Sequence, residues 1–186
     1  MAKPTPITFH VPASAANLGP GYGVIAVALD QPLGITVEPR TDGEVTVERR
    51  DDPHAHLEDP RHDPVLRGLR AGAALLDVPI QKGLTIVVEG TIPRGTGMGT
   101  VSAGYAAGLG AAVRLARKKI SPSLILDALV PLGGDPAHGA ASLLGGLCAA
   151  VPLSSPQSPV IEQRILPFPI HPDWHYVIAL PDMGVN

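Results

Sequence analysis

The chain is poor in aromatic residues, in cysteine and in net charge, and each shortage excludes a class of protein. Aromatic residues make up 3% of its 186 residues, so the core must be built from Ala, Val, Leu and Ile. Cys148 is the one cysteine, which excludes an internal disulfide framework. The formal net charge of −3 argues against a protein that binds a nucleic-acid backbone, because such proteins usually carry a strong basic excess.

Long apolar runs are also lacking. No stretch reaches the roughly 18 apolar residues that a membrane span requires, and residues 1–11 lack the apolar segment of a signal peptide. We therefore expect a cytoplasmic protein without a membrane partner. A hydrophobic share of 45% against a charged share of 17% predicts a folded core rather than a disordered chain.

The pattern of apolar residues predicts a mixed α+β fold. Residues 33–38 and 44–49 alternate on either side of Thr41-Asp42-Gly43, which predicts a β-hairpin. We expect further strands over 7–11, 24–29, 84–89, 146–151, 160–166 and 175–180, and helices over 64–76, 100–119, 122–130 and 136–144. Loops are expected where Gly, Pro or polar residues dominate, over 12–23, 51–60 and 152–159.

A glycine-rich segment between an expected strand and an expected helix is the sharpest local feature. Gly95, Gly97 and Gly99 let the backbone bend and bring its N–H groups close to a ligand. The first helical turn adds unsatisfied N–H donors and a positive dipole end, which suit a phosphate. An ordinary strand-to-helix turn is the alternative, and the spacing matches neither a Walker A nor a Rossmann pattern. The candidate phosphate-binding residues are Pro93, Arg94, Gly95, Thr96, Gly97, Met98, Gly99, Thr100, Val101, Ser102 and Ala103.

Two further segments combine polar residues with glycines. Asn17 either contacts a small ligand or holds its own loop through an Asx-type turn. Asp135 precedes Pro136, and this pair predicts a helix N-cap more simply than a metal ligand. No second group of ligands completes a metal site with the neighbouring histidines His54, His56 and His62.

Taken in order, the three segments resemble the motifs of the GHMP kinases, and among them those of the homoserine kinases. Residues 12–22, PASAANLGPGY, are similar to the substrate loop of that family. Residues 92–103 resemble its phosphate-binding loop, and residues 135–147 resemble its third segment. The resemblance implies a domain like ribosomal protein S5 domain 2 over residues 1–175. Residues 176–186 would then be the first strand of a C-terminal ferredoxin-like domain that is mostly absent.

The resemblance also implies a function, the ATP-dependent phosphorylation of the homoserine hydroxyl in threonine biosynthesis. The cofactors would be ATP and Mg²⁺, and the partners would be homoserine and the nucleotide. Asn17 and Gly21 match positions of the substrate loop. Thr100 and Asp135 are the remaining groups that match positions near the phosphates and the metal, which makes them the candidate catalytic residues. Loss of the second domain would expose an apolar face, so we expect self-association, for example as a homodimer.

Several polar positions of that family differ in this chain. Gly23 stands where the family has an aspartate that contacts the amino group of homoserine. Val101 and Gly133 stand where it has the serine and the glutamate that hold magnesium. Asp135 and His138 replace a histidine and an asparagine. Because valine and glycine cannot ligate a metal through their side chains, we expect impaired chemistry and assign no residue as a magnesium ligand. The alternative is an inactive module that binds a nucleotide or another protein.

Overall fold

The computed structural model describes residues 6–51, 60–80, 83–90, 92–155 and 158–180. Its strands are β1 (Ile7–Ala16), β2 (Ile25–Pro39), β3 (Val45–Arg49), β4 (Leu84–Glu89), β5 (Leu147–Ser155) and β6 (Ser158–Phe168). Its α-helices are α1 (Pro64–Leu75), α2 (Thr100–Leu115), α3 (Pro122–Leu129) and α4 (Pro136–Leu144). Short 3-10 turns cover Pro60–His62 and Val130–Leu132. The expected α+β class is confirmed.

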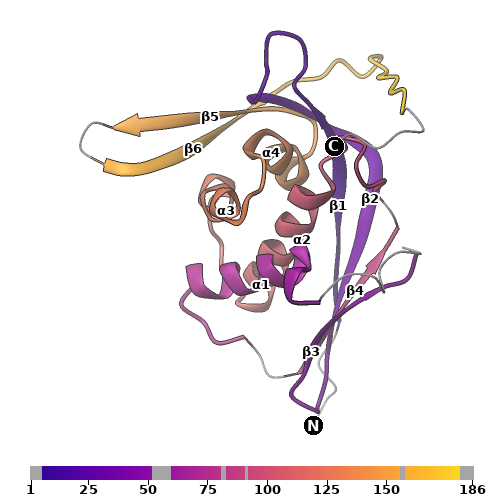
Figure 1. The fold of residues 1–186 in the computed structure, drawn as a ribbon, viewed down its shortest axis with the longest axis vertical. Coiled ribbons are helices and arrows are strands. Elements are labelled where there is room, and N and C mark those ends of the chain that lie inside the picture. The colour runs from indigo at the N-terminus through magenta and orange to yellow at the C-terminus, as the bar shows by residue number, and fades with distance from the viewer. Residues whose placement is uncertain (1–5, 52–59, 81–82, 91, 156–157, 181–186) are drawn as a thin grey trace.

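One six-stranded sheet and a layer of helices make up the fold (Figure 1). The strands follow one another in the order β3, β4, β2, β5, β6, and β1 also pairs with β2. Strands β3 and β4 are parallel and are connected through α1, whereas the other pairs are antiparallel. Within the helical layer, α2 packs on α1, α3 and α4, and it also contacts β1 of the sheet. This position brings the start of α2 next to β1.

Side-chain caps fix the starts of three of the helices. The Asp63 carboxylate accepts hydrogen bonds from the backbone N–H groups of Val65 (2.8 Å) and Leu66 (3.2 Å) at the start of α1. Arg49 in β3 pairs with the same carboxylate at 2.9 Å, which ties the helix to the sheet. Ser121 caps α3 in the same way, by accepting a hydrogen bond from the Leu124 N–H. The predicted helix starts at residues 64 and 122 are therefore confirmed, with their physical cause.

Glycines bring α1 and α2 into close contact. A methyl group at Gly72 would lie 2.6 Å from the Ala112 Cβ atom, and one at Gly104 would lie 2.6 Å from the Pro64 Cβ atom. The core around this contact is aliphatic, and Tyr105 is the one aromatic residue among the buried side chains that the structure describes. Cys148 is buried in β5, as expected. Close helix packing thus replaces the large side chains that the sequence lacks.

The predicted hairpin of residues 33–38 and 44–49 is wrong. Strand β2 runs without a break from Ile25 to Pro39, and β4 lies between β2 and β3. The five residues Leu84–Val88 of β4 are buried and apolar apart from Thr85, so burial favours a central position for this strand. The chain after β2 instead passes the start of β4, where the Arg40 N–H donates to the Gly83 carbonyl oxygen at 2.7 Å.

Four other predicted boundaries need correction. Strand β1 continues to Ala16 into the predicted loop 12–23, since its last residues pair with β2. The predicted loop 152–159 is largely a hairpin of β5 and β6, whose edge strand tolerates proline. Residues 175–180 form no strand, and the helix predicted over 100–119 ends at Leu115. The loop 51–60 lies mostly outside the described residues, as do His54 and His56.

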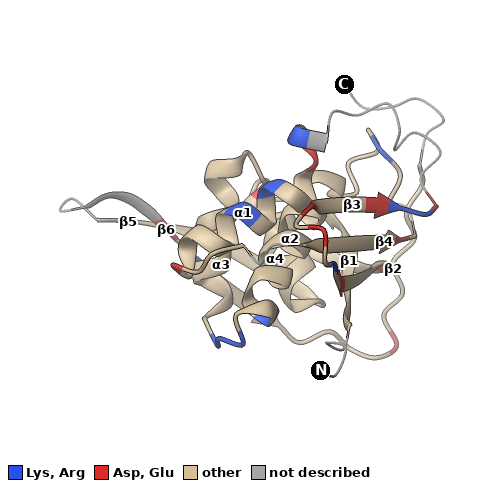
Figure 2. Ribbon diagram, turned by 90° about the horizontal axis from the view of Figure 1, so that it is seen from below, with Lys and Arg blue, Asp and Glu red and all other residues tan. Residues whose placement is uncertain are grey.

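The surface shows where this part of the chain is apolar or charged. Trp174 is 60% exposed and Val177 is 95% exposed, which leaves an apolar stretch after the last strand. In Figure 2, Lys and Arg are spread over several elements with Asp and Glu among them. Within the described residues, no helix combines the length and the apolar character needed to cross a bilayer.

Replacing Gly108 by alanine should lower the free energy of unfolding by about 1–3 kcal/mol, the usual cost of overpacking a core. A methyl group there would overlap the Val65 carbonyl oxygen of α1. The matched control is Gly110→Ala on the same helix. Its methyl group would meet only the end of the Arg114 side chain, at 3.2 Å, and the Phe9 ring, at 3.4 Å. Urea unfolding of both variants tests the contact, and equal stabilities would contradict it.

Candidate functional site

The segments 12–22, 92–103 and 135–147 meet at the start of α2. The Ser14 N–H in β1 donates to the Met98 carbonyl oxygen at 3.2 Å. The Ser14 hydroxyl lies 2.8 Å from Nδ1 of His138, which is in the first turn of α4. Residues 124 positions apart in the sequence are thereby joined beside one loop. The structure thus brings together the three segments that the sequence singled out.

The glycine-rich loop has the predicted form. Gly95, Gly97 and Gly99 all have positive φ angles, of 68°, 75° and 71°. The hydroxyl groups of Thr96 and Thr100 both donate to the Pro93 carbonyl oxygen, at 2.8 and 3.1 Å. Helix α2 begins at Thr100, so the prediction of a loop leading into a helix there is confirmed.

The N-terminus of α2 differs from those of the other α-helices. Its N-cap residue is Gly99, and no side chain caps its N–H groups. Side chains of Asp63, Ser121 and Asp135 cap α1, α3 and α4. The first N–H groups of α2 therefore remain available to an anion at the positive end of the helix dipole.

The glycines of the loop face different surroundings. A methyl group at Gly99 would lie 2.6 Å from the Ser14 hydroxyl oxygen and 2.7 Å from the His138 Nδ1 atom. A methyl group at Gly97 would meet no atom within 4 Å, and Gly97 itself is exposed. Gly99 thus forms the floor of the loop against the protein, whereas the Gly97 side of the loop is open.

The side chains of the predicted loop differ in exposure. Arg94, Gly95, Gly97 and Val101 are exposed. Other members are buried or turned inward, namely Met98, Ser102 and Ala103. The Ser102 hydroxyl accepts a hydrogen bond from the Asp135 N–H at 3.0 Å and lies 3.4 Å from the Asp135 carbonyl oxygen. The Ser102 hydroxyl thereby joins the first turns of α2 and α4.

Asp135 and Asn17 both support their own segments. One carboxylate oxygen of Asp135 accepts a hydrogen bond from the His138 N–H at 2.9 Å, which confirms the N-cap interpretation. The Asn17 side-chain oxygen accepts from the Gly23 N–H at 2.7 Å, and Asn17 has a φ of 61°. Gly21 is buried, and a methyl group there would lie 2.6 Å from the Ile25 side chain. The alternative in which Asn17 holds its own loop therefore has direct support.

At the glycines that depart from the GHMP pattern, no neighbouring side chain occupies the space that a larger residue would take. Methyl groups at Gly23 and Gly133 would meet no atom within 4 Å. The Val101 side chain is 49% exposed at the start of α2. No group of three or more His, Cys, Asp or Glu residues suited to a metal ion occurs among the described residues.

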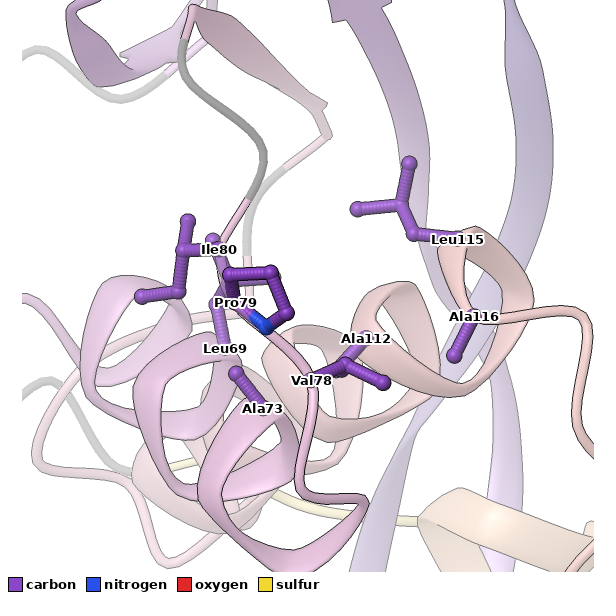
Figure 3. A pocket seen from close by; sticks show the side chains of 8 residues that line it. All are labelled: Leu69, Ala73, Val78, Pro79, Ile80, Ala112, Leu115 and Ala116. Atoms are coloured by element: carbon purple, nitrogen blue, oxygen red, sulfur yellow. The ribbon is translucent and has the colours of Figure 1, made fainter.

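An apolar pocket lies at the other end of α2 (Figure 3). It has a volume of about 220 Å³, and its lining is Leu69, Ala73, Val78, Pro79, Ile80, Ala112, Leu115 and Ala116. Twelve residues of helix separate Ala112 from Thr100, a rise of about 18 Å. The pocket is thus separate from the glycine-rich loop and offers no polar side chain for catalysis.

Ser14 is the site residue that the sequence analysis missed. It lies within the quoted motif of residues 12–22, where its small polar side chain stands among alanines. The structure buries it completely. Its partner, His138, is far away in the sequence, so no local spacing could have revealed the bond.

Acidification should destabilise the protein through His138. Burial lowers the pKa of His138 below its ordinary value of 6.5, and the Asp135 carboxylate partly opposes this shift. The unfolded chain therefore takes up a proton first as the pH falls from about 7 to about 5, so the free energy of unfolding should decrease. Urea unfolding across this range tests the effect. His138→Asn, which has no ring to titrate, should show a smaller decrease; equal decreases would contradict it.

Comparisons with known proteins agree with this arrangement. Residues 65–146 match the family described as GHMP kinases N terminal domain. The homoserine kinase of Corynebacterium kroppenstedtii is 31% identical over 185 residues, which cover 97% of this chain and 58% of that protein. The homoserine kinase of Mycobacterium sp. strain KMS is 32% identical over 189 residues, covering 94% of this chain and 55% of that protein.

Solved structures support the fold. The homoserine kinase from Cytophaga hutchinsonii superimposes with a TM-score of 0.71 at 19% identity, over 92% of this chain and 54% of that one. A mevalonate kinase from Methanococcus jannaschii gives a TM-score of 0.64 at 14% identity, over 78% of this chain and 53% of that one. The chain thus spans a little over half the length of the relatives it matches. With its three motifs joined at one loop and relatives of this kind, the chain carries a GHMP kinase N-terminal domain over residues 65–146 and is similar to the homoserine kinases.

Proposed function

We propose that this chain binds the phosphates of ATP at residues 93–103 and forms the nucleotide-binding part of a homoserine kinase-like phosphotransferase. The observation that carries the proposal is the uncapped start of α2, reached through three glycines with positive φ angles. Backbone N–H groups and a helix dipole bind phosphate without needing a particular side chain. The GHMP kinase N-terminal domain supports ATP as the nucleotide.

Homoserine is the proposed acceptor because the relatives found at about 30% identity are homoserine kinases. The reaction class is transfer of the terminal phosphoryl group of ATP to the homoserine hydroxyl, a step of threonine biosynthesis in the cytoplasm. Asn17 and Gly21 shape the substrate loop in this proposal. The bond from Asn17 to the Gly23 N–H supports a role for Asn17 in loop shape rather than direct substrate contact. The chain would also associate with itself, a proposal supported by the exposed apolar side chains of Trp174 and Val177.

The side chains near the loop offer few free ligands for magnesium. Thr100 and Asp135 are the side chains left to meet it, and both are engaged, with the Pro93 carbonyl oxygen and the His138 N–H respectively. Mg²⁺ commonly reaches such sites on substrate phosphates with one or two carboxylates from the protein. The donor set here therefore fits a metal carried by the nucleotide better than one held by the protein. When bound, the ion would neutralise charge on the transferred phosphoryl group.

A second candidate function is an inactive nucleotide-binding module. The open space at Gly23 and Gly133 and the exposed Val101 side chain favour it, because no side chain replaces the polar groups of the family there. Both candidates share the phosphate loop and differ in catalysis. An activity assay therefore separates them, whereas nucleotide binding tests what they have in common.

Gly97→Val should abolish ATP binding. Gly97 has a φ of 75°, a left-handed conformation that a β-branched residue such as valine rarely adopts, so the loop would have to change shape. Thr100→Ala should weaken binding by only about 1 kcal/mol, the net worth of an ordinary hydrogen bond. Removal of Mg²⁺ should also have little effect on the affinity for ATP. Calorimetric titration of ATP with and without Mg²⁺ measures all three effects.

The matched control is Gly43→Val. Gly43 has a φ of 82° and equally open space, but it lies between β2 and β3. This variant should lose similar stability while binding ATP as the parent does. If Gly97→Val binds ATP as tightly as the parent, the loop is an ordinary turn and the proposal is wrong.

The chain should turn over ATP with homoserine far more slowly than an ordinary enzyme. Loss of side chains that recruit the metal should cost several kcal/mol in the transition state, and each 1.36 kcal/mol is about tenfold in rate. A coupled assay of ATP consumption with homoserine and Mg²⁺ tests this, with the Corynebacterium kroppenstedtii relative as the positive control. A turnover of about 1 s⁻¹ or faster would contradict the expected impairment.

A further inference from the structure

Resting on the proposed phosphate site, we infer that His138 and Ser14 are positioning residues that hold the phosphate loop in its binding shape through their mutual hydrogen bond. The inference starts from the 2.8 Å contact between the Ser14 hydroxyl oxygen and Nδ1 of His138. Ser14 has no exposed surface, and among the described residues the His138 ring is the hydrogen-bond partner of its hydroxyl group. A buried hydroxyl group without a partner is costly, so the pair holds its geometry.

The pair lies directly beneath the loop. A methyl group at Gly99 would lie 2.6 Å from the Ser14 hydroxyl oxygen and 2.7 Å from His138 Nδ1, so the Gly99 backbone packs against the bond itself. Gly99 is also the N-cap residue of α2, with a φ of 71°. The Ser14 backbone contacts the same loop, because its N–H donates to the Met98 carbonyl oxygen at 3.2 Å. Movement of either partner would therefore displace the residues that set the direction of the first N–H groups of α2.

His138 is itself held in place. It lies in the first turn of α4, where its N–H donates to the Asp135 carboxylate at 2.9 Å. The Asp135 N–H in turn donates to the Ser102 hydroxyl oxygen in the first turn of α2, at 3.0 Å. The starts of α2 and α4 are thus joined on one side by Ser102 and Asp135. On the other side, His138 and Ser14 join α4 to β1, and Gly99 packs against their hydrogen bond.

The test uses ATP as the probe and the whole 186-residue chain. Ser14→Ala and His138→Leu each remove one partner, and the double variant removes both. His138→Asn keeps a polar atom at the δ position, bonded to Cγ as Nδ1 is, so it can still meet the Ser14 hydroxyl group. The matched control is Ser142→Ala. Ser142 is also a buried serine that joins α4 to β1, through a 3.2 Å hydrogen bond to the Pro12 carbonyl oxygen, but it is not among the atoms packed against Gly99.

Two readouts are measured on each variant: ATP affinity by calorimetry, and hydrogen exchange of peptides covering residues 95–102 without nucleotide. We expect Ser14→Ala and His138→Leu each to weaken ATP binding about fivefold or more, which is what one hydrogen bond contributes. The ATP affinity of the double variant should be no lower than that of the single variant that binds ATP more weakly, since both changes break the same hydrogen bond. His138→Asn should bind within about twofold of the parent. Ser142→Ala should lose stability but keep both the ATP affinity and the loop exchange rate of the parent.

The exchange readout separates this inference from the proposed function. If the parent fails to bind ATP, the proposed function is wrong, whereas faster exchange of the loop in Ser14→Ala and His138→Leu still supports the positioning role. If the loop of His138→Leu exchanges its amide hydrogens at the rate of the parent, and the variant binds ATP as tightly as the parent, the inference is overturned. The inference is equally overturned if Ser142→Ala changes the loop as much as Ser14→Ala.

Discussion

The contact between α1 and α2 is the constraint on which the rest of the structure depends. Glycines at this contact let the two helices approach until a methyl group at Gly72 or Gly104 would meet the facing helix at 2.6 Å. A chain with so few aromatic residues has little bulk to fill a wider space, so close approach is its route to dense packing. The same contact fixes the axis of α2 and therefore the direction in which its first N–H groups point. The packing of the core therefore sets the orientation of the glycine-rich loop, in addition to the sequence of the loop itself.

The site is built from backbone more than from side chains. Carbonyl oxygens of Pro93 and Met98 accept the hydrogen bonds that close the loop, and the polar side chains of Ser102 and Asp135 bond to backbone groups. The side chains that matter for the shape of such a loop are those that support it from below, as Ser14 and His138 do, rather than those on its exposed side. Changes at exposed positions such as Val101 therefore leave the backbone of the loop intact.

Local signals in the sequence were sufficient for local structure. Asp63 and Ser121 before prolines marked two helix starts, and the spacing of Gly95, Gly97 and Gly99 marked the loop before α2. Long-range pairing was beyond such signals. The alternation of apolar residues on both sides of residue 43 is the same whether β3 pairs with β2 or lies on the far side of β4. The burial of β4 favours the second arrangement, in which β4 lies between β2 and β3. The bond between Ser14 and His138 joins residues 124 positions apart, so it follows from the assembled fold and from nothing local.

The glycines at positions 23 and 133 also bear on how this chain could change over evolutionary time. Their φ angles are 69° and 93°, a region in which an ordinary side chain costs roughly 1–2 kcal/mol, although aspartate tolerates it better than glutamate does. Placing an aspartate at position 23 is therefore a smaller step than placing a glutamate at position 133. Space does not limit either change, since a Cβ atom at Gly23 or Gly133 would meet no atom within 4 Å. The backbone conformation alone sets the cost of an acidic side chain at these two positions.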